Sequence, residues 1–127
     1  MKKPQKLLRD IFGFDEFRLG QREIIDAVSS KKNVLAIMPT GGGKSLCFQL
    51  PALMSEGLTV VISPLIALMR DQVRGLQAAG VAAGALTSGN TEDETDSVFS
   101  EIYAGTLKIL YVAPERLASS AMQSALF

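Results

Sequence analysis

The chain has 127 residues, of which 47% are hydrophobic, so it can form one packed domain at most. Its 13 basic residues balance 13 acidic ones, so composition alone gives no electrostatic sign of nucleic-acid binding. One cysteine and no histidine exclude an internal disulfide and argue strongly against a zinc site. No apolar run approaches the roughly 20 residues that span a bilayer, and no signal-peptide pattern is present, so we expect a cytoplasmic protein without membrane contact.

The N-terminal third is expected to contain two helices followed by one buried strand. Apolar residues recur at helical spacing from Leu7 to Phe12, and Gly13 is a natural stop. The second helix should turn Ile24, Ile25 and Val28 inward. In chain order the expected elements are a helix over 7–12, a turn over 14–21, a helix over 21–29, a loop over 29–33 and a strand over 34–38.

The rest of the chain alternates helices and strands. The expected order is a helix over 44–56 with a kink or restart at Pro51, a strand over 58–63, a helix over 64–79, a strand over 81–86, a loop over 87–90, a helix over 92–104, a strand over 108–112, a turn over 113–115 and a helix over 119–127. Strands that alternate with helices of this length predict right-handed βαβ units and a parallel sheet.

Two of these helices carry sharper expectations. The helix that Pro64 opens should bury one apolar side, formed by Leu65, Leu68, Met69, Val73 and Leu76, and should end at Gly80. The helix over 92–104 begins with a capping-box signature at Thr91 and Glu94 and should end at Gly105. Its predicted buried side chains are Val98, Phe99, Ile102 and Tyr103.

The stretch from Met38 to Ser45 reads Met-Pro-Thr-Gly-Gly-Gly-Lys-Ser between a predicted strand and a predicted helix. This layout is typical of a phosphate-binding loop, in which bare backbone N–H groups and a helix N-terminus surround the anion. Lys44 adds a positive charge for the outer phosphates, and the Ser45 hydroxyl is a ligand for Mg²⁺. Met38 stands where the strict pattern has its first glycine. The alternative is a glycine-rich turn that binds nothing.

Three unusual stretches should lie at the carboxyl ends of strands, where open α/β sheets bind ligands. They are the glycine loop, Ser63-Pro64-Leu65 and Ala113-Pro114-Glu115. The two proline-containing turns have an equally plain interpretation, because proline commonly ends strands.

The stretch from Phe14 to Gln21 is a second candidate site. Phe14 offers an aromatic face, Arg18 a planar cation, and Gln21 an amide that both donates and accepts, a set suited to adenine. The alternative is that Phe14 and Phe17 are core residues and Arg18 is a solvated charge.

Nucleotide hydrolysis also needs an acidic residue on a neighbouring strand to hold the metal ion. No apolar strand in this sequence ends in Asp-Glu. Glu115 follows a proline, and Asp71 lies inside a predicted helix, so both are poor candidates. The sequence therefore predicts a nucleotide site that lacks its second half.

The ordered motifs resemble those of RecQ-family ATP-dependent DNA helicases of superfamily two. Residues 12–25 look like the family's adenine-recognition motif, and residues 38–45 look like its motif I, in which a residue other than glycine commonly opens the loop. Residues 63–73 are similar to motif Ia, and residues 111–117 to the family's Pro-Glu motif. The family's DEAH motif, aromatic-rich loop, arginine finger and second RecA-like domain would all follow Phe127.

The resemblance implies a P-loop NTPase (RecA-like) fold and an incomplete first helicase domain over residues 1–127, with N-terminal helices over 1–32 and a βαβ core over 33–127. It implies ATP and Mg²⁺ as cofactors, and the remaining helicase domains and single-stranded or duplex DNA as partners. Phe14 would stack on adenine, Arg18 and Gln21 would read its edge, Lys44 would act in catalysis, and Ser45 would bind Mg²⁺. The implied triphosphate-binding residues are Thr40, Gly41, Gly42, Gly43, Lys44 and Ser45, and the implied DNA-binding residues are Ser63, Pro64, Leu65, Pro114 and Glu115.

The resemblance therefore implies the ATP-binding part of a 3′–5′ DNA helicase that acts in repair or recombination, located at the nucleoid if bacterial. The 127-residue chain alone is expected to be inactive. One alternative is a non-catalytic module that uses ATP as a switch, because the metal acid is absent. Another is a different P-loop enzyme, such as a kinase or a transporter ATPase, which would leave the residues around Phe14 and Glu115 without a role.

Overall fold

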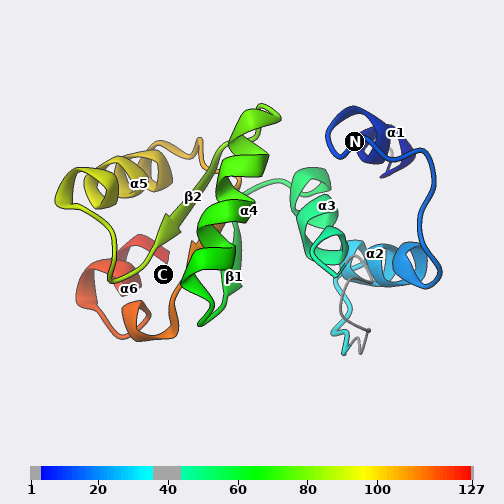
Figure 1. Ribbon diagram of the computed structural model, residues 1–127. Coiled ribbons are helices and arrows are strands. Elements are labelled where there is room, and N and C mark those ends of the chain that lie inside the picture. The colour runs from blue at the N-terminus through cyan, green and yellow to red at the C-terminus, as the bar shows by residue number, and fades with distance from the viewer. Residues whose placement is uncertain (1–3, 36–43, 127) are drawn as a thin grey trace. The chain divides into compact units, whose positions relative to one another are not determined.

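The computed structural model describes residues 4–35 and 44–126, and the chain divides into two compact units, Met1–Glu56 and Gly57–Phe127. The described part of the first unit is helical, and the second unit is built on a sheet (Figure 1). Each unit has its own hydrophobic cluster. The alternation of helices and strands that the sequence predicts is confirmed in the second unit.

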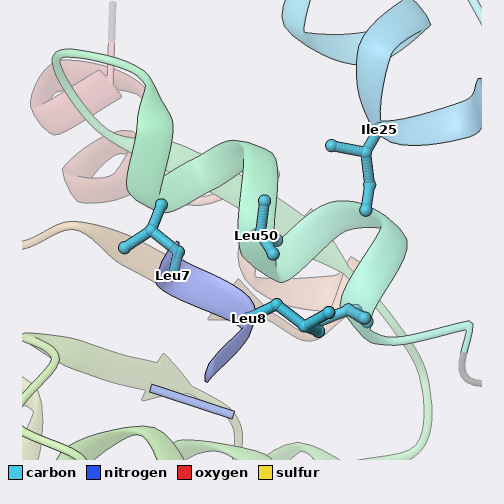
Figure 2. Packing of buried hydrophobic residues seen from close by; sticks show 5 residues of the cluster. Leu7, Leu8, Ile25 and Leu50 are labelled. Atoms are coloured by element: carbon cyan, nitrogen blue, oxygen red, sulfur yellow. The ribbon is translucent and has the colours of Figure 1, made fainter. Parts of the chain in front are cut away.

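Three helices form the described part of the first unit: α1 (Pro4–Asp10), α2 (Gln21–Ser29) and α3 (Leu46–Met54). Their buried residues meet in one cluster, in which Ile25 of α2 and Leu50 of α3 are fully buried together with residues of α1 (Figure 2). The members of the cluster are Leu7, Leu8, Ile25, Leu46 and Leu50. Burying such side chains is worth about 1.5–3 kcal/mol each, so this cluster is the main force that joins the three helices.

Helix α3 differs from its prediction at its C-terminal end. It runs without a restart through Pro51 and ends at Met54, two residues before Glu56. Ser55 adopts an extended conformation and its backbone N–H donates to the Pro51 carbonyl at 3.0 Å, which closes the last turn. A proline inside a helix cannot donate from its own nitrogen and its ring crowds the preceding turn, so Pro51 is an unfavourable residue within α3.

The predicted strand over 34–38 is wrong at its first two residues. Val34 and Leu35 have no regular secondary structure, and Leu35 is 89% exposed. A buried strand needs a neighbour to pair with, and the elements of residues 4–35 and 44–56 are all helices. The remaining residues of the predicted strand, 36–38, lie outside the described residues.

The second unit has a three-stranded parallel sheet in the order β1-β3-β2, as the sequence predicts for its class. The strand last in sequence is central, with Val60 and Gly84 both opposite Leu110. The elements are β1 (Thr59–Ile62), α4 (Ile66–Ala78), β2 (Ala83–Leu86), α5 (Glu92–Ala104), β3 (Ile109–Val112), a 3₁₀ turn over Pro114–Arg116, and α6 (Ser120–Leu126).

The core of this unit is centred on β3, all four residues of which are buried. Leu86, Leu110, Val112 and Met122 belong to one cluster, against which the half-buried Val98, Phe99 and Ile102 of α5 pack. The predicted inward positions of Leu65, Leu68 and Tyr103 are wrong, because all three are exposed. On α4 the buried residues are Met69, Val73 and Leu76, as predicted.

Helix termini follow the sequence signals closely. The Thr91 hydroxyl accepts from the Glu94 N–H at 3.2 Å, and the Glu94 carboxylate accepts from the Thr91 N–H at 2.8 Å, which confirms the capping box of α5. Gly80 and Gly105 have φ values of 87° and 74°, a backbone conformation that glycine adopts without strain. No helix in the described part of the chain is both long and apolar enough to cross a bilayer.

Candidate functional site

The end of the predicted phosphate loop leads directly into α3. Lys44 is exposed and Ser45 is half-buried, and both lie in the turn that opens the helix. The Ser45 carbonyl accepts from the Gln49 N–H at 2.9 Å, so this residue begins the helical hydrogen bonding. Its hydroxyl makes no capping hydrogen bond to the helix. Thr40, Gly41, Gly42 and Gly43 lie outside the described residues.

The N-terminus of α3 is favourable for an anion. The first N–H groups of a helix carry partial positive charge, and the Lys44 ammonium adds a full charge at the same end. Leu46, the first residue of α3, belongs to the buried cluster, which fixes this end of the helix in its unit. The arrangement is suited to holding a phosphate group at Lys44 and Ser45.

The second candidate stretch is a loop between α1 and α2. Phe14 is 54% exposed, and its backbone N–H donates to the Leu8 carbonyl at 3.1 Å. The interpretation of Phe14 as a core residue is therefore wrong. Phe17 does pack against the buried cluster, and the Arg22 guanidinium lies 5.6 Å from the centre of its ring. Arg18 is exposed at the same loop.

Gln21 is the buried member of this loop, with only 3% of its surface exposed. The side-chain Oε1 of Gln21 accepts from the Arg18 backbone N–H at 2.7 Å, and the backbone N–H of Gln21 donates to the Arg18 carbonyl at 3.1 Å. Gly20, with φ of 85°, makes the sharp entry into α2. Since Gln21 starts α2 and α2 packs against α3, the loop and Lys44 belong to one unit with one core.

The other candidate residues lie at the carboxyl edge of the sheet in the second unit. Ile62 pairs with Val112, and the Ser63 N–H donates to the Val112 carbonyl at 3.1 Å. This pairing brings Ser63-Pro64-Leu65 beside Ala113-Pro114-Glu115, as predicted for two strands that end at one edge. Pro64, Leu65, Pro114 and Glu115 are exposed, and Ser63 is half-buried.

A third segment, residues 87–90, begins at the same edge because it follows β2. The sequence predicts only a loop there. The Ala113 N–H donates to the Leu86 carbonyl at 3.0 Å, which sets the start of this segment beside the end of β3. Asn90 organises the segment: its Oδ1 accepts from the Thr87 hydroxyl at 3.1 Å, and its Nδ2 donates to the Ala85 carbonyl at 2.8 Å. The alternation of strands and helices was the signal that placed the segment at this edge.

Two titratable groups have clearly shifted pKa values. Burial raises the pKa of the Cys47 thiol, as expected for a small buried residue near the start of α3. Hydrogen bonds from the Thr91 backbone and side chain lower the pKa of Glu94. Among residues 4–35 and 44–126, no group of three or more His, Cys, Asp or Glu side chains is arranged to hold a metal ion.

The sequence has close relatives among helicases. It is 52% identical over 114 residues to the ATP-dependent DNA helicase RecQ of Pasteurella multocida, covering 90% of this chain and 18% of that protein. It is 47% identical over 120 residues to RecQ of Bacillus subtilis, covering 94% and 20%. It is 45% identical over 122 residues to the ATP-dependent DNA helicase Q1 of Rattus norvegicus, covering 94% and 20%. The chain spans about a fifth of the length of these relatives.

A solved structure shares the fold of this chain. The crystal structure of the DUF1998 helicase MrfA bound to DNA superposes with a TM-score of 0.74 at 20% identity, over 94% of this chain and 18% of that one. At this identity the likeness speaks for the fold, an incomplete RecA-like α/β domain. The sequence profile of the DEAD/DEAH box helicases matches residues 18–126. The chain therefore belongs to the DEAD/DEAH box helicase family, and within it the sequence is of the RecQ type.

Proposed function

We propose that the chain is the ATP-binding part of a RecQ-type DNA helicase that couples ATP hydrolysis to 3′–5′ unwinding of duplex DNA in repair or recombination. The observation that carries the proposal is the 45–52% identity to proteins named as ATP-dependent DNA helicases, which extends over both candidate stretches. In a bacterial cell such an enzyme works in the cytoplasm, at the nucleoid.

In this proposal the first unit binds ATP. Phe14 stacks on the adenine, and Arg18 and Gln21 contact its edge. The backbone of residues 40–43 surrounds the phosphates, and the Lys44 ammonium stabilises the negative charge that develops at the γ-phosphate during transfer. The exposure of Phe14 and Lys44 supports these roles, because a ligand can reach both side chains.

Mg²⁺ is the metal ion that this chemistry requires, and the described residues fit it in part. The Ser45 hydroxyl is an oxygen ligand at the start of α3, beside Lys44. Residues 4–35 and 44–126 hold no group of three or more His, Cys, Asp or Glu side chains arranged for a metal ion, so they do not form a complete set of protein ligands by themselves. When bound, the ion neutralises charge on the β- and γ-phosphates.

The second unit contacts single-stranded DNA in this proposal. Ser63, Pro64 and Leu65 lie beside Pro114 and Glu115 at one edge of the sheet, which suits contact with a continuous backbone. A photocrosslinking residue at position 65 should capture a single-stranded oligonucleotide, while the same residue at the exposed Gln123 of α6 should not. Equal capture at both positions would contradict the assignment.

The ATP site is tested by binding of a fluorescent, non-hydrolysable ATP analogue. Lys44→Ala should weaken binding about tenfold or more, since hydrogen bonds to charged groups contribute about 1.5–3 kcal/mol. Lys32→Ala removes another exposed lysine of the same unit and should leave binding unchanged. Equal affinities of the wild type and Lys44→Ala would refute the assignment of the phosphate site.

A second candidate function is a nucleotide-binding switch without catalysis, which the lack of an acidic cluster in the described residues favours. The two candidates differ in turnover. We expect the 127-residue chain to bind the analogue and to hydrolyse ATP negligibly, whereas a longer protein that continues into the rest of the helicase should hydrolyse it. Mg²⁺-dependent turnover by the short chain, abolished in Lys44→Ala, would overturn the idea that the chain alone is inactive.

A further inference from the structure

Two backbone carbonyls of β2, on its outer edge, point away from the rest of the sheet. The Ala82 and Leu86 carbonyls accept from the N–H groups of Lys108 and Ala113, at 2.9 and 3.0 Å, so they face β3. Carbonyls alternate sides along a strand, and those of Ala83 and Ala85 therefore point outward. Among the described strands, β2 pairs with β3 alone, so this side is an edge.

Two amide side chains from outside the strand cover these carbonyls. The Nε2 of Gln77, near the end of α4, donates to the Ala83 carbonyl at 2.9 Å. The Nδ2 of Asn90, after β2, donates to the Ala85 carbonyl at 2.8 Å. Both outward acceptors of the strand are thus occupied by donors that come from the two segments that flank it in sequence.

The strand itself has nothing with which to cover its edge. Its first three residues are Ala83, Gly84 and Ala85, whose small side chains leave the backbone accessible. The edge opens into a cavity of about 630 Å³, which Gln77 and Asn90 line together with residues of α4 and α5. Figure 1 shows these two helices on either side of β2. An extended segment therefore has room to approach the strand between the helices.

We infer that Gln77 and Asn90 block the outer edge of β2 against pairing with a strand from a second copy of the chain. An uncovered edge is a template for such pairing, and natural proteins commonly protect it with side chains or bulges. A second copy is the relevant partner, because its own β2 offers the same small, apolar residues with the same outward backbone groups. This role is independent of ATP or DNA binding.

The test is the oligomeric state of a double variant, Gln77→Met with Asn90→Ala. Methionine keeps the length of the side chain and its helix propensity but removes the donor. Alanine removes the donor to Ala85 without adding a charge, which would itself protect the edge. The matched control is Gln123→Met, which removes an exposed amide from α6.

Sedimentation velocity over a range of protein concentrations should show the double variant rising toward the mass of a dimer where the wild type and the control do not. Hydrogen exchange on the associated variant should show new protection at residues 83–86. A folded variant that keeps the wild-type mass at every concentration would overturn the inference, as would new protection confined to β1. If the double variant unfolds, the single variant Gln77→Met tests the inference, because it leaves the loop of Asn90 intact. It should still show a smaller shift toward the mass of a dimer.

Discussion

The side-chain oxygen of Gln21 accepts a hydrogen bond from the Arg18 backbone N–H at 2.7 Å, and the Gln21 backbone N–H donates to the Arg18 carbonyl at 3.1 Å. The pair closes the turn that leads into α2, with Gly20 at its sharpest point. A residue proposed to read adenine is therefore also part of the structure that presents Phe14 and Arg18. Removing its side chain would change both roles at once, so the two roles have to be separated by chemistry.

The substitution Gln21→Glu separates the role of this side chain in the turn from its proposed role in contacting adenine. The glutamate keeps the oxygen that accepts from the Arg18 N–H, but Gln21 is 3% exposed, so the buried charge should lower the free energy of unfolding by about 1–3 kcal/mol, which urea unfolding measures separately from nucleotide binding. The substitution removes the NH₂ donor, so affinity for an adenine nucleotide should fall about tenfold and the preference for adenine over guanine should be lost. Gln123→Glu is the control for the added charge. An unchanged base preference in Gln21→Glu would show that the amide does not read the base.

Stability at low pH should depend on Glu94. Hydrogen bonds from Thr91 hold the pKa of this carboxyl below its ordinary value of 4.5 in the folded chain. The unfolded state therefore binds the proton more readily, so the stabilisation is complete above pH 4.5 and is lost as the pH falls through the folded pKa. Urea titrations at a series of pH values should show a shallower loss of stability below pH 4.5 for Glu94→Gln than for the wild type.

The cap itself can be measured at neutral pH. Thr91→Ala removes the hydroxyl that accepts from the Glu94 N–H, and loss of such a cap costs about 1 kcal/mol. Thr91→Ser keeps an equivalent hydroxyl and should be close to the wild type in urea unfolding. If the alanine and serine variants were equally stable, the capping interaction would make no net contribution in water.

Gly84 is a packing position where one methyl group should be destabilising. A Cβ at this residue would lie 3.2 Å from Cγ2 of Val98 and 3.5 Å from Cδ1 of Leu107. Gly84→Ala should therefore lower the free energy of unfolding by about 1–3 kcal/mol, because the χ1 of valine has little freedom to adjust. In a Val98→Ala background the same change should cost clearly less, and a double-mutant cycle by urea unfolding measures the difference. Equal costs in both backgrounds would mean that Val98 is not the obstacle.

Cys47 provides a probe of the first unit. Burial raises the pKa of its thiol, so the thiolate that reacts with alkylating reagents is scarce in the folded chain. Because the sequence has a single cysteine, labelling at neutral pH should be slow in the native state and fast in urea. Leu50→Ala, which opens a cavity in the same helix at a cost of about 2–5 kcal/mol, should speed native labelling. Fast labelling of the native wild type would contradict the burial of the thiol.

Much of the fold follows from local sequence signals. The capping box at Thr91, the glycine at 105 and the alternation of apolar segments each depend on neighbours within a few residues, and each is confirmed. The errors arise where a residue lies at the margin of a helical face. Tyr103 is about 140° around the helix from Val98, which takes it off the buried stripe. Leu65 is exposed because α4 begins at Ile66, two residues later than the predicted start at Pro64.

Relationships between distant residues could not be predicted from periodicity. The sequence indicates a parallel sheet but not that β3 lies between β1 and β2, and this order is what brings Ser63 beside Val112. The hydrogen bonds of Gln77 and Asn90 to the edge of β2 likewise depend on where α4 ends relative to the strand. The candidate site was easier to recognise, because Lys44, Ser45 and the residues from Phe14 to Gln21 lie in contiguous motifs.

The central position of β3 has a consequence for the synthesis of the protein. Among the described strands, neither β1 nor β2 has the other as a neighbour, and each pairs with residues 109–112. While the ribosome makes the fifty or so residues before β3, the segments that become β1 and β2 have no strand to pair with. The sheet therefore forms late and in a single step once Val112 emerges. A nascent chain halted before Ile109 is thus a natural client for chaperones.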